Sequence, residues 1–136
     1  MITCEKLEKH YGKRAILTDV SFQIDEPKII GLIGRNGVGK STLLKIIAGH
    51  AKASNGNIEV FGKKPFQNLT VTANTIFIED AMTFPAVLTL GEIFKSAQKF
   101  YINFATDLAF ELLRFSNISE KNYHYQLSKG QKATFN

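Results

Sequence analysis

The chain has 136 residues, of which 44% are hydrophobic and 21% are charged. This composition is typical of a folded globular domain and excludes an intrinsically disordered chain. The net charge of +5 suits polyanionic ligands in general, but the basic residues are spread along the chain, so we expect a solvated surface and no nucleic-acid partner.

The N-terminal residues MITCEKLEKHYGKR carry charges where a secretory signal peptide has its apolar segment. No apolar run approaches the roughly 18 residues of a membrane span, so any membrane association is expected to be peripheral. Cys4 is the only cysteine, which excludes an internal disulfide and a cysteine-based metal cluster and fits a reducing compartment. We therefore expect a cytoplasmic protein.

The first half of the chain alternates short β-like runs with turns. Residues 2–7 and 15–24 predict two strands, and in the second the apolar residues Val20, Phe22 and Ile24 recur at period two. Residues 28–34, KIIGLIG, are apolar on both faces, which predicts a buried parallel strand.

A glycine-rich loop follows, in which GRNGVGKS matches the pattern GxxxxGKS. Such glycines let backbone N–H groups wrap around phosphates, while Lys40 can reach the β and γ phosphates and Ser41 can ligate Mg²⁺. Because the loop lies between a predicted strand and an apolar-faced helix, it predicts nucleotide binding; the alternative is a glycine-rich turn without a ligand. The predicted phosphate-binding residues are Gly34, Arg35, Asn36, Gly37, Val38, Gly39, Lys40, Ser41 and Thr42.

Residues 40–50 predict a helix that ends at Gly49, residues 54–65 a strand between two turns, and residues 74–80, NTIFIED, another buried strand. From Phe84 onward the pattern is helical. Thr89 and Glu92 form a capping box that opens a helix. A second helical run carries an apolar stripe for which we expect core packing, a ligand-binding surface being the alternative; the stripe is Phe104, Leu108, Leu112 and Phe115.

The last residues, YQLSKGQKATFN, predict the start of a helix with Ser128 as its cap and Gly130 open to a ligand. This segment resembles part of the ATP-binding-cassette ATPases, the family that powers ABC transporters. Four further elements occur in the order and approximate spacing of that family: Tyr11 in KHYGKRAIL, LTDVSFQI, the phosphate loop and SNGNIEVFGK. The most specific element resembles the LSGGQ signature of that family, at Leu127, Ser128, Lys129, Gly130 and Gln131.

The resemblance implies an α/β P-loop NTPase fold of the ABC ATPase type. A β-rich core with the phosphate loop would span residues 1–83, and a helical signature subdomain residues 84–136. It also implies that Tyr11 stacks on the adenine of ATP and that the signature faces the γ-phosphate of ATP on a second ABC ATPase subunit. The implied partners are that subunit and a transmembrane permease, which would place the protein on the inner face of the membrane.

The chain departs from the family pattern in three places. Glu79 takes the position of the usual glutamine near Mg²⁺ and the attacking water, which predicts a catalytic role for it and, together with Ser41, a role as metal ligand; Asp80 is the alternative, at a shift of one residue. A carboxylate can accept but not donate a hydrogen bond there. Lys129 replaces a glycine of the signature, and KAT follows Gln131 in place of the usual polar and arginine residues.

The family places its Walker B aspartate, catalytic glutamate and switch histidine after the signature. We therefore expect an N-terminal portion truncated before the Walker B strand, which by itself would not hydrolyse ATP. Alternatives are a non-hydrolytic nucleotide-binding regulatory module, an ABC ATPase that acts on ribosomes or DNA, and a compact ATPase in which TIFIED is the Walker B strand.

Overall fold

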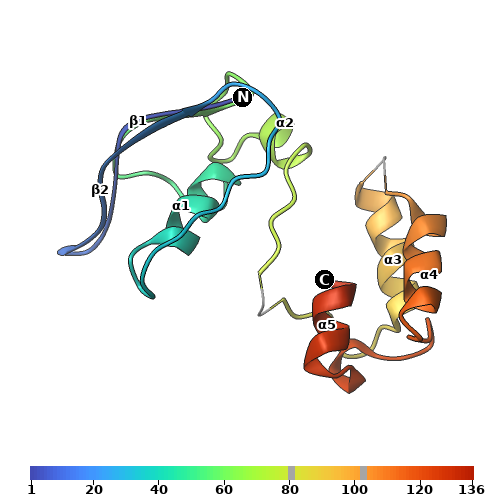
Figure 1. Cartoon of the computed structure of the whole chain (residues 1–136). Helices are drawn as coiled ribbons and strands as arrows, with labels where there is room; N and C mark the ends of the chain where they lie inside the picture. Colours follow the sequence, from blue (N-terminus) through green and yellow to red (C-terminus); the bar gives the residue numbers. More distant parts are fainter. Residues whose placement is uncertain (80–81, 102–103) are drawn as a thin grey trace. The chain divides into compact units, whose positions relative to one another are not determined.

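The structure, a computed structural model, describes residues 1–79, 82–101 and 104–136. These residues form two compact units, Met1–Phe77 and Ile78–Asn136, and each unit has its own apolar core. Figure 1 shows the strands and the first two helices in one unit and the remaining helices in the other.

The first unit contains a three-stranded antiparallel sheet with the strand order β2-β1-β3. β1 (Ile2–Tyr11) and β2 (Arg14–Ile24) form a hairpin, and β3 (Asn55–Val60) pairs with the other edge of β1. Gly12 closes the hairpin with a φ of +58°, which glycine adopts without strain. The strands predicted at residues 2–7, 15–24 and within 54–65 are thus confirmed.

Helix α1 (Lys40–Ile47) packs against the sheet and supplies part of the apolar core of the first unit (Figure 1). The helix stops before Gly49, whose φ of +81° confirms the predicted terminator. Asn68 caps the single turn of α2 (Leu69–Thr72) through its Oδ1. The buried core residues come from all three strands and from α1: Cys4, Leu7, Leu17, Leu43, Ile46 and Ile58.

The two predictions of a buried strand, at residues 28–34 and 74–80, are wrong. Residues 28–34 and 74–79 form no strand, and Ile29, Ile33 and Ile76 are 103%, 95% and 80% exposed. An apolar run becomes a strand only when neighbouring strands accept its backbone hydrogen bonds, and the described residues supply none for these two segments. Ile30 and Ile76 instead line one pocket of 430 Å³ beside the sheet.

The second unit is helical and contains α3 (Leu90–Phe100), α4 (Thr106–Phe115), the short 3₁₀ helix η1 (His124–Gln126) and α5 (Lys129–Phe135). α3 and α4 lie side by side (Figure 1). The predicted capping box at Thr89 and Glu92 is confirmed, with hydrogen bonds in both directions. The core is formed by Leu90, Ile93, Phe94, Leu113, Ile118 and Leu127, and the Phe135 ring stacks on the Phe94 ring at 5.1 Å.

The apolar stripe predicted to pack in the core of this unit lies mostly on its surface. Leu108 and Leu112 are 54% exposed and Phe115 is 87% exposed, whereas only Phe104 packs against the core. α4 instead buries the adjacent side, on which Leu113 is 4% exposed and Ala109 and Phe110 pack against the core. α4 is apolar on two sides, and tertiary packing determines which side is buried.

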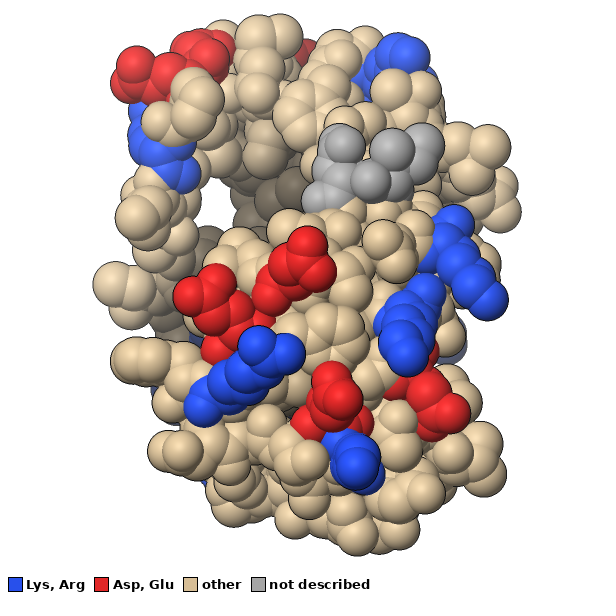
Figure 2. Space-filling view, turned by 90° about the vertical axis from the view of Figure 1, so that its right-hand side faces the viewer, with Lys and Arg blue, Asp and Glu red and all other residues tan. Residues whose placement is uncertain are grey.

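No helix among the described residues has the length and apolar character needed to cross a membrane. On the face shown in Figure 2, Lys and Arg side chains are intermingled with Asp and Glu side chains. Neither sign of charge forms a continuous patch on that face, as a solvated surface predicts.

Candidate nucleotide-binding site

The predicted phosphate loop joins residues 28–33, which form neither helix nor strand, to the N-terminus of α1. Gly37 and Gly39 have φ values of +80° and +107°, in the left-handed region that favours glycine. A Cβ at Gly39 would lie 2.8 Å from Cδ2 of Leu17 and 2.9 Å from the carbonyl oxygen of Ile16. The absence of a side chain at Gly39 therefore lets the end of the loop pack directly against β2.

Helix α1 begins without a side-chain cap and without an acidic residue in its first turn. The first N–H groups of a helix have no intrahelical partner, and the helix dipole favours negative charge at this end. The exposed Ser41 adds a hydroxyl oxygen, the type of ligand that Mg²⁺ accepts. The donors and the hydroxyl at this helix start fit a Mg²⁺-bound triphosphate.

The side chain of Lys40 folds back over the loop. Its Nζ donates hydrogen bonds to the carbonyl oxygens of Gly34, at 2.6 Å, and Arg35, at 2.9 Å. The ammonium is thereby held at the loop by two neutral acceptors, which the anionic oxygens of a phosphate can replace in stronger hydrogen bonds between two ions. Loop residues 34–38, which include both acceptors, are exposed, so a ligand can reach them from solvent.

Tyr11 lies in the same unit, at the end of β1, and is 55% exposed. It is paired with Arg14 across the hairpin turn. Further along the ladder, Lys9 lies opposite Leu17, the residue against which Gly39 packs. In the hairpin, Tyr11 thus lies two residues along β1 from the residue paired with Leu17, and Leu17 packs against the phosphate loop.

Lys9, which was not predicted from the sequence, also belongs to this site. Its Nζ lies 4.7 Å from the centroid of the Tyr11 ring. Residues two apart on a strand project to the same face, so this spacing was a signal from which the pair could have been found.

The signature-like segment lies in the second unit. Ser128 caps α5 as predicted: its Oγ accepts a hydrogen bond from the Gln131 N–H at 3.2 Å, and the Gln131 side chain accepts one from the Ser128 N–H at 3.0 Å. Leu127 is buried, whereas Lys129 and Gly130 are exposed. A Cβ at Gly130 would meet no atom within 4 Å, so the backbone there is accessible.

Glu79 is an exposed residue of the second unit, and its carbonyl oxygen accepts a hydrogen bond of 3.1 Å from the Met82 N–H. Ser41, with which it was predicted to share Mg²⁺, belongs to the first unit. The shared metal therefore stays a prediction. Asp80, the alternative position, lies outside the described residues.

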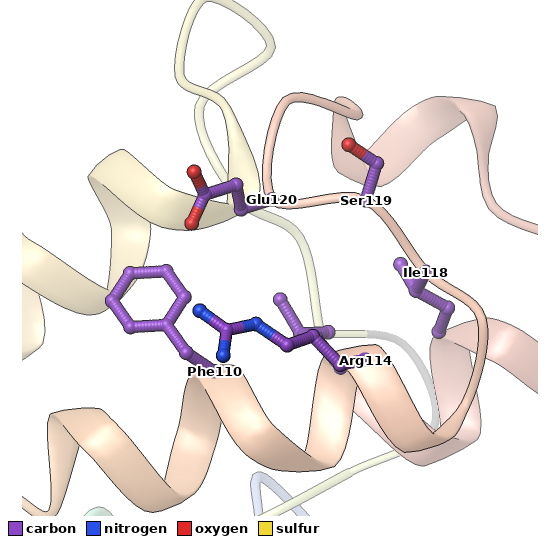
Figure 3. Close-up of a pocket in the computed structure, with 6 residues that line it drawn as sticks. Phe110, Arg114, Ile118, Ser119 and Glu120 are labelled. Carbon is purple, nitrogen blue, oxygen red and sulfur yellow. The ribbon is translucent and has the colours of Figure 1, made fainter.

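A separate pocket in the second unit lies between α4 and the loop that follows it (Figure 3). Its volume of 210 Å³ is below the roughly 300 to 1,000 Å³ of ligand-binding pockets. We therefore assign no ligand to it. It is lined by Phe110, Leu113, Arg114, Ile118, Ser119 and Glu120.

Comparison with known proteins gives a consistent result. The family model described as "ABC transporter" matches residues 17–136. The ABC transporter ATP-binding protein YtrB of Bacillus subtilis is 31% identical over 97% of this chain and 45% of its own length. The manganese transport system ATP-binding protein MntB of the same organism is 49% identical over 39% of this chain and 21% of its own length. The chain thus spans less than half of these two relatives.

Solved structures agree in fold. An ATP-binding subunit of an ABC transporter superposes with a TM-score of 0.82 at 25% identity, covering 98% of this chain and 58% of that subunit. The dimeric ATP-binding cassette MJ0796, solved with ADP and phosphate, superposes with a TM-score of 0.77 at 22% identity, covering 99% of this chain and 66% of that cassette. The chain therefore belongs to the ABC transporter family and has the fold of its ATPase domains.

Proposed function

We propose that this chain is the ATP-binding part of an ABC transporter, in which ATP binding and hydrolysis by a full-length dimer drive the transport of a substrate across a membrane. The observation that carries the proposal is the phosphate loop, residues 34–42. It combines left-handed glycines, an uncapped helix start and an ammonium held at the loop. Each of these features suits a bound triphosphate.

Within the site, Lys40 would leave the carbonyl oxygens of the loop and bind the β and γ phosphates. The Ser41 hydroxyl would ligate the Mg²⁺ ion, which neutralises phosphate charge when bound. The exposed ring of Tyr11 would stack on the adenine. Glu79 would lie near the metal and accept a hydrogen bond from a metal-bound water, without the donor that a glutamine has.

A second ABC ATPase subunit is the proposed partner of the signature segment. The start of α5 and the open backbone at Gly130 would offer N–H donors to the γ-phosphate of ATP held by that subunit. The dimeric state of the cassette MJ0796 supports this arrangement.

A transmembrane permease is the proposed partner of the helical unit. Its exposed apolar residues Leu108, Leu112 and Phe115 form a surface that an apolar contact would remove from water. Docking there would hold the chain at the inner face of the membrane.

Hydrolysis is proposed for the full-length protein, because the family's hydrolytic residues follow the signature segment. Binding alone can be tested on the 136-residue chain by titration calorimetry with ATP and Mg²⁺. We expect Lys40→Ala to weaken ATP binding by about tenfold or more, because charge-assisted hydrogen bonds to phosphate are lost.

Lys64→Ala is the matched control, since Lys64 is an exposed lysine of the same unit outside the loop. Equal ATP affinity in the wild type and Lys40→Ala would contradict the proposed site. ATP binding without turnover in a full-length dimer reconstituted with its permease would contradict the transport role and favour a regulatory module.

A further inference from the structure

The half-buried side chain of Lys9, on the central strand β1, is held by two partners. Its ammonium lies over the Tyr11 ring, 4.7 Å from the ring centroid, and the same Nζ donates a hydrogen bond of 2.7 Å to the carbonyl oxygen of Lys52. A lysine side chain samples many rotamers when it has no partner, and these two contacts restrict that of Lys9.

Strand geometry explains why the two side chains meet. Lys9 and Tyr11 are two residues apart on β1, so they project to the same face of the strand. Leu7, two residues earlier, is fully buried in the core that includes Leu43 and Ile46 of α1. The pairing with β2 shifts register between Leu7 and Lys9 and again between Lys9 and His10, so it is the contact between Lys9 and Tyr11 that shows that these two side chains share a face.

The Lys52 carbonyl ties this arrangement to the rest of the unit. Lys52 lies in the connection between α1 and β3, so the hydrogen bond joins the end of the hairpin to the segment that follows α1. On the other side, the Lys9 backbone pairs with Leu17, which contacts the phosphate loop at Gly39. Lys9 thus connects the Tyr11 ring to both ends of α1.

The contact also acts on the ring itself. The ammonium is attracted to the π electrons on one face of the ring, while the ring remains 55% exposed and can accept a planar partner. A ring that is already fixed in place loses less rotamer freedom when a planar base stacks on it.

We propose that Lys9 is a positioning residue for the nucleotide base: it fixes the Tyr11 ring, anchored on the Lys52 carbonyl, in the orientation in which adenine stacks on the opposite face. This inference rests on the proposed nucleotide site. It assigns to Lys9 an effect on the base alone, separate from the phosphate contacts of Lys40.

The test compares the binding of MgATP with that of Mg²⁺-tripolyphosphate, which has the phosphates but no base, by titration calorimetry of the 136-residue chain. Lys9→Met keeps the apolar stem and removes the ammonium. We expect it to weaken MgATP binding about threefold or more and to leave tripolyphosphate binding unchanged. Lys9→Arg, which keeps a cation over the ring, should restore the affinity for MgATP.

Lys13→Met is the matched control, because Lys13 is an exposed lysine in the adjacent hairpin turn, and it should change neither affinity. The double variant Lys9→Met/Tyr11→Ala should bind MgATP as Tyr11→Ala does, since Lys9 acts through the ring. Far-UV circular dichroism should show that each variant is folded.

Three outcomes would overturn the inference. Equal losses for MgATP and tripolyphosphate would show a general charge effect, additive losses in the double variant would show that Lys9 acts independently of Tyr11, and an unchanged MgATP affinity in Lys9→Met would show no effect at all. MgATP binding that is insensitive to Lys40→Ala would instead overturn the proposed site, and the inference about Lys9 with it.

Discussion

The Nζ of Lys40 lies 2.6 Å from the carbonyl oxygen of Gly34, six residues earlier in the chain. This hydrogen bond lies at the surface and is replaced by water when the ammonium is removed. We expect Lys40→Ala to change the free energy of unfolding by less than about 1 kcal/mol while it weakens ATP binding. Urea denaturation followed by circular dichroism measures the first quantity, and a loss of several kcal/mol would show that Lys40 has a structural role.

Gly39→Ala should both destabilise the first unit and impair the phosphate loop. The new Cβ would lie 2.8 Å from Leu17 Cδ2 at a φ of +107°, so steric overlap and backbone strain add to each other. We expect a loss of about 1 to 3 kcal/mol in urea denaturation. Gly31→Ala is the matched control, because a Cβ there meets no atom within 4 Å; equal losses in both variants would contradict this explanation.

The capping box of α3 makes part of the second unit sensitive to acid. Hydrogen bonds from the N–H and hydroxyl of Thr89 hold the pKa of Glu92 below its ordinary value of 4.5. The folded state binds the proton less tightly than the unfolded state, so this stabilisation is complete above about pH 4.5 and is lost as the pH falls through the lower, folded pKa.

Amide hydrogen exchange at the start of α3 should therefore accelerate on acidification beyond the intrinsic pH dependence of exchange. In Glu92→Gln, whose side-chain oxygen can still accept a hydrogen bond but does not titrate, the additional acceleration should disappear. An identical pH profile in both proteins would show that another group is responsible.

Adjacent leucines of α4 should respond differently to truncation. Leu113 is 4% exposed and belongs to the core, whereas Leu112 is 54% exposed. We expect Leu113→Ala to destabilise the second unit by about 2 to 5 kcal/mol and Leu112→Ala by less than about 1 kcal/mol. Urea denaturation of both variants distinguishes this orientation of α4 from the opposite one, in which the two values would be exchanged.

Ser128→Ala should loosen the start of α5. The variant loses the hydrogen bond from the Gln131 N–H, and loss of such a cap reduces helix stability by about 0.5 to 2 kcal/mol. Faster amide exchange at residues 130–132 is the expected result. Ser128→Asp, which can also cap, should restore protection; if it does not, the hydroxyl has some role other than capping.

The features that could be predicted from the sequence are those encoded locally. The strand alternation at Val20, Phe22 and Ile24 and the caps at Thr89 and Ser128 depend on residues a few positions apart, and the structure contains each of them. Gly37 and Gly39 of the phosphate loop belong to the same group, because the tolerance of a positive φ is a property of glycine itself.

The features that were not predicted depend on distant partners. Whether the apolar run around Ile29 becomes a strand depends on neighbouring strands, and which side of α4 is buried depends on α3 and on Leu127. The contact of Lys9 with the Lys52 carbonyl likewise joins residues 43 positions apart. Local patterns do not contain this information.

The exposed segment KIIGLI, residues 28–33, has a consequence for handling the chain in solution. It is a six-residue window of high β-propensity with a single charge and no proline, and its backbone is not paired within the sheet. Such windows nucleate cross-β aggregation when they stay open. The yield of soluble protein should therefore fall as concentration rises during refolding, and a charged substitution at Ile29 should delay that loss.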